Sequence, residues 1–167
     1  MNEEEKKLEE ERNGVKEDFG KPVGIYELEV IDKETGKVLE TRRVKNLVVN
    51  SGKTAIRDGL SNGINWGWYW KGIKIGKNGT APTVNDTDLA EPYRGVVGSN
   101  SWDDVNKRRV VEALFIDFTE TVNICEAGLF YYNQYTFTWG AMFSRVTFAS
   151  LELSPTKHLK VKIYIIP

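Results

Sequence analysis

The alternation of apolar and polar residues in short runs is the feature that most constrains how this chain folds. In the last run, every second residue from Leu159 to Ile165 is aliphatic, and Lys160 and Lys162 occupy positions between them. Successive side chains of a β-strand point to opposite faces, so this pattern predicts a strand with one buried face. Further strand-like runs cover residues 109–118, 124–132 and 141–151.

The first alternating segment has the pattern of a β-hairpin. Tyr26, Leu28 and Val30 share one face of an extended segment. Residues 32–36 supply turn-forming side chains, and residues 37–44 return as a second strand. Ser51 then precedes an apolar pattern that predicts one short helix, with Ser51 as its N-cap.

Three tryptophans stand at alternate positions after this helix. Residues 64–75 predict a strand with a bend at Gly72, and Trp66, Trp68 and Trp70 project from one face of it. These indoles are candidates for the core, for a partner or subunit interface, or for a ligand platform. Residues 76–92 are rich in Gly, Asn, Asp, Thr and Pro and predict a long surface loop.

Six or more strands with one short helix predict a mainly β fold. We expect an antiparallel β-sandwich or a jelly-roll-like barrel over residues 24–167. The chain of 167 residues, 40% of them hydrophobic, is long enough to bury a core of this kind. It shows neither internal repeats nor the strand–helix rhythm of a parallel sheet.

Residues 1–23 are predicted to form a charged N-terminal arm. Residues 1–18 contain eight acidic and four basic side chains, a local charge of −4. Leu8 and Val15 follow Met1 at intervals of seven, which is one apolar position per heptad instead of the two of a coiled coil. The arm is expected to be disordered, helical or ordered by a partner, with Leu8 and Val15 as candidate contacts at a partner or subunit interface.

Composition argues against several classes of protein. The formal net charge of −1 provides no global field for nucleic acid. The single cysteine, Cys125, excludes an internal disulfide and suggests a chain that folds in a reducing compartment or needs no crosslink. The N-terminus lacks the pattern of a signal peptide, and no run approaches the roughly 20 apolar residues that span a bilayer. We therefore expect no nucleic-acid or membrane partner.

Few residues offer catalytic or ligand-binding chemistry. A Cys125–His158 dyad is one possibility, and a packed thiol with an exposed imidazole is the simpler interpretation. Residues 85–88 with Glu91 place oxygen ligands close together, as a calcium site requires, but Asp and Asn also cap turns. We expect a non-enzymatic protein without catalytic, cofactor-binding or metal-binding residues.

Four segments taken together resemble a family of tailed-bacteriophage virion structural proteins, which includes tail-fibre-like, head-fibre-like and capsid-decoration components. They are residues 45–53, 73–91, 124–130 and 142–148. The positions that carry the resemblance are Asn46, Gly52, Gly76, Gly79, Asp86, Asp88, Glu126, Gly128, Phe130 and Arg145. The glycines suit tight or left-handed backbone, Asp86 and Asp88 suit turn capping, and Glu126 is expected to pair with Arg145 on a neighbouring strand.

The resemblance implies a structural component of a virus particle, made in the host cytoplasm. Its expected partners are copies of itself, in a homotrimer by analogy with phage fibres and decorations, and virion proteins such as the major capsid protein or tail proteins. The alternatives are a tail-tip or fibre protein that binds a host surface glycan, and a carbohydrate-binding β-sandwich module of another class. Abundant Lys and Glu beside a single Gln, Gln134, suggest a thermophilic host.

Overall fold

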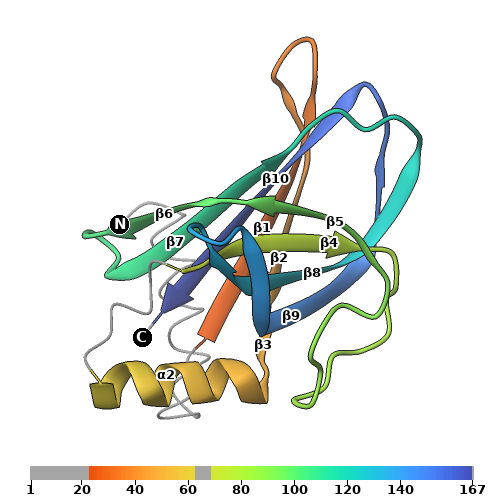
Figure 1. Ribbon diagram of the computed structural model, residues 1–167. Coiled ribbons are helices and arrows are strands. Elements are labelled where there is room, and N and C mark those ends of the chain that lie inside the picture. Colours follow the sequence, from red (N-terminus) through yellow and green to blue (C-terminus); the bar gives the residue numbers. More distant parts are fainter. Residues whose placement is uncertain (1–22, 63–68, 167) are drawn as a thin grey trace.

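The computed structural model describes residues 23–62 and 69–166, and over this part it confirms a mainly β fold with one short helix (Figure 1). Leu8, Val15, Trp66 and Trp68 lie outside the described residues. The elements are β1 Val23–Asp32, β2 Val38–Lys45, β3 Leu47–Val48, α2 Asn50–Asn62, β4 Trp70–Gly76, β5 Pro92–Val97, β6 Ser99–Asp103, β7 Arg108–Phe115, β8 Val122–Asn133, β9 Thr138–Leu153 and β10 Lys157–Ile166.

The strands form two antiparallel sheets that pack face to face. Sheet A has the order β2-β1-β10-β7-β6, and sheet B has the order β3-β9-β8-β4-β5. The predicted hairpin is present as β1 and β2, and its turn projects beyond the sheets (Figure 1). Asp32 closes this turn by accepting the N–H of Thr35 at 2.8 Å, and Gly36 has a φ of 70°.

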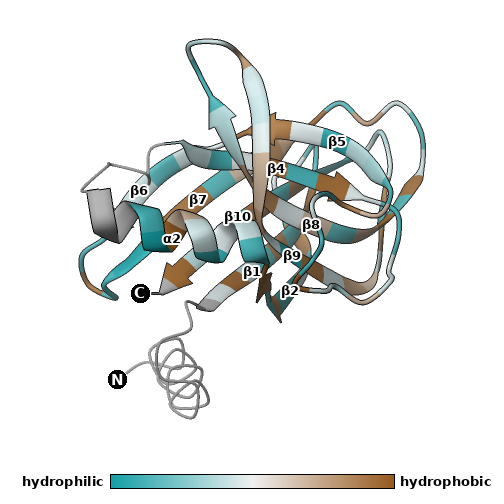
Figure 2. Ribbon diagram, turned by 60° about the horizontal axis from the view of Figure 1, so that its bottom comes forward, coloured by the Kyte–Doolittle hydropathy of each residue, from teal (hydrophilic) through white to brown (hydrophobic). Residues whose placement is uncertain are grey.

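The core fills the space between the sheets. Alternate residues of β1, β10 and β7 point inward from sheet A, as the sequence predicts, and Figure 2 shows hydrophobic and hydrophilic residues alternating along the strands. Phe115 is fully buried there. The Tyr26 hydroxyl lies 2.8 Å from Ser144 Oγ and joins the two sheets by a buried hydrogen bond, and burial raises the pKa of Tyr26.

The chain passes directly from one sheet to the other at both sides of the sandwich. Asn46 is the step between β2 and β3, and its Oδ1 accepts the N–H of Gly24 at 2.8 Å. Gly98 is the step between β5 and β6, which Figure 1 shows as one continuous ribbon. The N–H of Gly98 donates to the carbonyl of Lys71 at 2.7 Å. On each side of the sandwich, one chain segment therefore joins the edge strands of the two sheets.

Two parts of the sequence prediction are wrong. The helix begins at Asn50, and Ser51 donates its hydroxyl to the carbonyl of Met142 instead of capping the helix. The predicted strand over residues 64–75 is present from Trp70 as β4, and its first residues lie outside the described part of the chain. Strands β5 and β6 are absent from the sequence prediction, because their Gly, Pro, Ser and Asn residues have low β-propensity.

The helix lies at one end of the sandwich, across β9 (Figure 1). Gly52 makes this packing possible, because a Cβ at this position would overlap the carbonyl group of Phe143. Gly52 belongs to the positions that carry the resemblance, and its role here is structural. No helix in the described part of the chain is long and apolar enough to cross a lipid bilayer.

Replacing Gly98 by Ala is expected to lower the free energy of unfolding by about 1–3 kcal/mol, because the new Cβ would overlap the carbonyl oxygen of Glu112. Urea denaturation would measure this loss. Gly79→Ala is the matched control, because its Cβ would meet only Cys125 Cβ, at an ordinary 3.6 Å. Equal stabilities of the two variants would contradict the role assigned to Gly98.

Candidate functional site

The predicted pairing of Glu126 with Arg145 is present on the outer face of sheet B. Glu126 lies on β8 and Arg145 on β9, which are neighbouring antiparallel strands. Arg145 Nε and Nη2 donate to Glu126 Oε2 at 3.0 and 2.8 Å. The Glu126 side chain is 0% exposed and that of Arg145 is 3% exposed. The pair is therefore desolvated, and it must be compensated by further hydrogen bonds.

Those hydrogen bonds come from the loop of residues 77–91. Glu126 accepts the backbone N–H groups of Ala90 at 2.9 Å and of Glu91 at 2.8 Å, with a longer contact to Asn78 at 3.3 Å. Arg145 donates to Asp86 Oδ2 at 2.8 Å and to the carbonyl of Thr80 at 3.0 Å. The Glu126–Arg145 pair thus fixes both ends and the middle of this loop to the sheet.

Asp86 and Asp88 hold the loop in different ways. Asp86 caps a turn by accepting the N–H and the hydroxyl of Thr83, at 3.0 and 2.7 Å. Burial opposes its ionisation, but the hydrogen bonds from Thr83 and Arg145 together outweigh burial and lower the pKa of Asp86. Asp88 accepts the N–H of Leu89 at 2.8 Å and pairs with Lys74 at 3.1 Å. Among the described residues, no group of three His, Cys, Asp or Glu side chains is arranged to hold a metal ion.

The glycines around this pair are required for close approach. A Cβ on Gly76 would overlap the Glu126 carboxylate, and a Cβ on Gly128 would lie 2.8 Å from the Phe130 ring. Gly36 is the one described glycine with a positive φ, so the left-handed alternative is wrong for Gly76, Gly79 and Gly128. Phe130 forms a second small apolar cluster on the outer face of sheet B, together with Val49, Leu89 and Met142.

Trp70 does not present a surface to any partner. It is 5% exposed and makes edge contacts with Tyr131 and Phe143, at ring-centroid distances of 5.7 and 5.3 Å. The interface and platform alternatives therefore do not hold for this residue, which belongs to the core. The alternation that suggested a shared exposed face places Trp70 inward instead.

Cys125 and His158 are not brought together. Cys125 is half-buried in sheet B beside Gly79 of the loop, whereas His158 alternates with lysines on β10 of sheet A. His158 is also half-buried, and its Nε2 is buried without a hydrogen-bond partner, so the expectation of an exposed imidazole is wrong.

An exposed aromatic hairpin is the surface feature that the sequence analysis missed. It comprises Tyr135 and Phe137 at the turn between β8 and β9, which are 74% and 77% exposed, and Trp139 at the start of β9, which is 37% exposed. Asn133 Oδ1 fixes the turn by accepting the N–H of Tyr135 at 2.9 Å. Phe137 has a φ of 55°, an unfavourable conformation for a bulky residue. The run of aromatic residues from 131 to 139 was the available sequence signal.

Trp139 packs against two glycines, whose lack of a side chain leaves room for the indole. A Cβ on Gly95 would lie 2.9 Å from Trp139 Cη2, and a Cβ on Gly72 would overlap the same indole. Trp139 also makes edge contacts with Tyr132 and Phe130, at centroid distances of 5.4 and 6.3 Å. The aromatic hairpin therefore has a rigid base on sheet B and two freely exposed rings at its tip.

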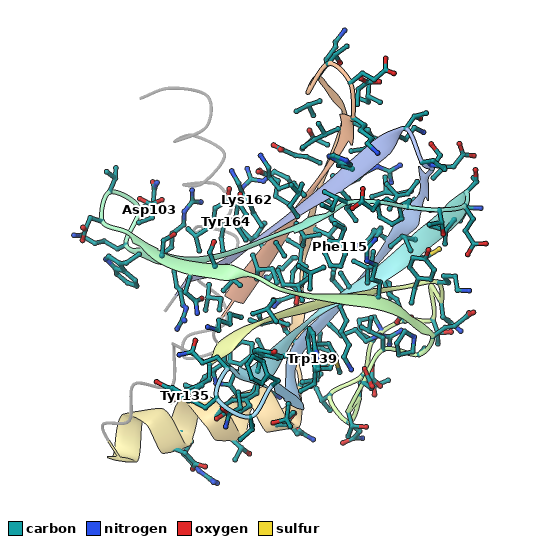
Figure 3. The ribbon with its side chains drawn as sticks, turned by 45° about the horizontal axis from the view of Figure 1, so that its top comes forward. Asp103, Phe115, Tyr135, Trp139, Lys162 and Tyr164 are labelled. Carbon is teal, nitrogen blue, oxygen red and sulfur yellow. The ribbon has the colours of Figure 1, made fainter. Side chains whose placement is uncertain are left out.

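The outer face of sheet A carries charged residues on the opposite side of the core. Figure 3 shows Asp103, Lys162 and Tyr164 on one side of Phe115, and Tyr135 and Trp139 on the other. Asp103 accepts the side-chain N–H of Asn106 at 2.8 Å and that of Arg108 at 2.9 Å. These contacts lower the pKa of Asp103 to about 2, chiefly through Asn106. Burial raises the pKa of Tyr164 to about 12.

Arg145→Met is expected to lower the free energy of unfolding by about 3–5 kcal/mol, because it leaves the buried Glu126 carboxylate without its cation. Arg42→Met is the matched control, since Arg42 pairs with Glu40 at 2.6 Å in a partly exposed position, where about 0–1 kcal/mol is typical. Chemical denaturation would measure both losses. A double-mutant cycle with Glu126→Gln that shows no coupling would contradict the assigned pairing.

Asn106→Ala is expected to raise the pKa of Asp103 from about 2 towards 3.8, the ordinary value of an aspartate side chain. The lowered pKa stabilises the fold fully above the unfolded value, and this contribution is lost as the pH falls through about 2. A carboxyl ¹³C NMR titration would follow the change. Asn78→Ala, a matched amide removal in the loop, should leave the Asp103 titration unchanged, and the same curve in wild type and Asn106→Ala would refute the assignment.

The geometry offers two kinds of surface for function. The Glu126–Arg145 pair and its loop have their polar groups satisfied internally, so their role is architectural. The aromatic hairpin presents apolar rings to solvent from a rigid base. Comparisons of the chain with protein-family models, with curated proteins and with solved structures found no significant match.

Proposed function

We propose that this chain is a non-enzymatic structural protein of a tailed-virus particle, where it decorates the capsid surface or serves as an accessory component. It assembles with copies of itself and with other virion proteins. Two things support the proposal: the resemblance of about residues 45–165 to phage virion proteins, and a surface suited to protein contacts. In the described residues, the functional groups that could perform chemistry are separated or already hydrogen-bonded to one another.

The exposed aromatic hairpin is the observation that carries the proposal. Tyr135 and Phe137 are about three-quarters exposed, at 74% and 77%, on a turn whose backbone is fixed by Asn133. Aromatic side chains are enriched at the centres of protein interfaces, because they bury large areas with little loss of conformational entropy. A φ of 55° is an unfavourable backbone conformation for Phe137. Such strain is typical of functional sites, and here it exposes the ring without any gain in packing within the domain.

The clamped loop supports the same proposal in a different way. Eight of the positions that carry the resemblance, from Gly76 to Arg145, lie on the outer face of sheet B or in the loop that covers it. They have structural roles and leave the exposed surface free to vary. This is expected of relatives that share a scaffold and bind different neighbours in a particle.

A second candidate function is binding of a glycan, either as a tail-tip or fibre protein or as a carbohydrate-binding module. Trp139 favours it, because the indole lies on Gly72 and Gly95 with 37% of the residue exposed. Lys74 and Asp88 lie close to it, with Lys74 Nζ 5.6 Å from the indole centroid. An aromatic ring beside charged hydrogen-bonding groups is a common arrangement for sugar recognition.

Light scattering of the purified full chain is expected to give a homotrimer, in agreement with the proposed assembly. Tyr135→Ser with Phe137→Asn should shift the mass towards the monomer, because these changes remove both exposed rings. Asn accepts the positive φ at residue 137, so the turn is retained.

Val105→Ser is the matched control, because Val105 is 84% exposed on the hairpin between β6 and β7. This variant should keep the wild-type mass. A wild-type chain that stays monomeric at high concentration would contradict self-assembly. Glycan-array binding that is lost in Trp139→Ala would then favour the second candidate.

A further inference from the structure

Arg108 on the outer face of sheet A has an unfilled hydrogen-bonding position. The residue is only 7% exposed, and its guanidinium lies 3.9 Å from the centroid of the Tyr164 ring. Its Nε donates to Asp103 at 2.9 Å, but its Nη1 is buried without a hydrogen-bond partner. A buried guanidinium N–H without an acceptor is costly, and a carboxylate is the acceptor that best matches its geometry.

The other charges on this face are already matched. Glu27 lies 3.4 Å from Arg43 Nε, and Glu112 lies 3.9 Å from Lys162 Nζ. Asp103 is shared between Arg108 and Asn106. A further carboxylate at Arg108 must therefore come from outside the described part of the sheet.

The start of the described chain lies two strands away from Arg108, at the same end of sheet A. Val23 is in register with Ile166 of β10, and the next residues, Gly24 and Ile165, continue in register with Arg109 of β7. Two strand spacings separate β1 from β7, a distance of roughly 10 Å. The 22 residues that precede Val23 are thus tethered close to the unfilled N–H group, at an effective concentration on the order of millimolar.

The composition of the preceding segment matches what Arg108 lacks. Residues 1–18 carry eight carboxylates against four basic groups, and six of the carboxylates form two runs of three, residues 3–5 and residues 9–11, the second of which is nearer in sequence to Val23. Residues 19–167 have a formal charge of +3. The acidic arm and the remainder of the chain are therefore of opposite sign.

We propose that the N-terminal arm of the same chain binds the outer face of sheet A, with one of its glutamates accepting the hydrogen bond from Arg108 Nη1. The interaction is intramolecular, and it is independent of the aromatic hairpin on sheet B.

Paramagnetic relaxation enhancement in the full chain tests this proposal. A nitroxide is attached at Asn13→Cys in a Cys125→Ser background, so that it is the one label. We expect loss of the amide signals of Arg108, Val110 and Tyr164, and retention of those of Thr35 and Gly36 at the distant β1–β2 turn. Salt at 1 M, where the Debye length is about 3 Å, should restore the lost signals.

Variants on both partners separate a specific contact from chance proximity. Glu9→Gln, Glu10→Gln and Glu11→Gln together leave the sandwich untouched and should restore the signals, as should Arg108→Gln. The matched controls are Glu34→Gln, Glu120→Gln and Glu152→Gln together, and Arg42→Gln, which should leave the effect unchanged. Uniform broadening, or broadening that survives neutralisation of the arm, would overturn the proposal.

Mixing the two kinds of chain distinguishes an intramolecular contact from an exchanged arm. Spin-labelled chains without isotope are mixed with unlabelled ¹⁵N chains, so that only contacts between chains broaden the observed signals. Unaffected signals of Arg108 and Tyr164 in this mixture are expected. Their loss in the mixture would show that the arm of a second copy occupies the face, and it would overturn the intramolecular assignment.

Discussion

The outer face of sheet B depends on one buried ion pair, Glu126 with Arg145. Burial of two charges costs several kcal/mol per ion, and their attraction alone does not reliably compensate for it. Here the backbone N–H groups of Ala90 and Glu91 and the carboxylate of Asp86 supply the remaining hydrogen bonds. The pair is tolerable only while the loop of residues 77–91 is in place, and the loop is ordered only while the pair is formed. Pair and loop therefore form one cooperative unit.

The linkage of the two sheets depends on a few backbone contacts. The chain changes sheet at Asn46 and at Gly98, so one continuous segment joins the edge strands of the two sheets on each side of the sandwich. Open edge strands are sites of unwanted pairing between chains. The side chains of Tyr135 and Phe137 project from the surface and offer a contact between chains that does not use these edges.

Much of the fold follows from the sequence because a single physical rule, burial of one face of a strand, produces its pattern. The hairpin of β1 and β2, the strands β7 to β10 and the Glu126–Arg145 pair were predicted. Strands β5 and β6 were not, because their pairing is dictated by the crossover at Gly98 and not by their own residues. An aromatic residue in such a pattern can pack in the core or be exposed to a partner, and the sequence does not distinguish the two: Trp70 lies in the core, whereas Trp139 is partly exposed.

The packing of Trp139 on Gly72 and Gly95 has an evolutionary consequence. The indole comes from β9, and the glycines from β4 and β5, so three distant positions share one volume. A side chain at either glycine would displace the ring. Loss of the ring would expose two glycines in adjacent strands, and a glycine inside a strand weakens the strand. Substitutions at these positions are therefore epistatic, and a lineage can exchange this arrangement for another only by changing the three positions together.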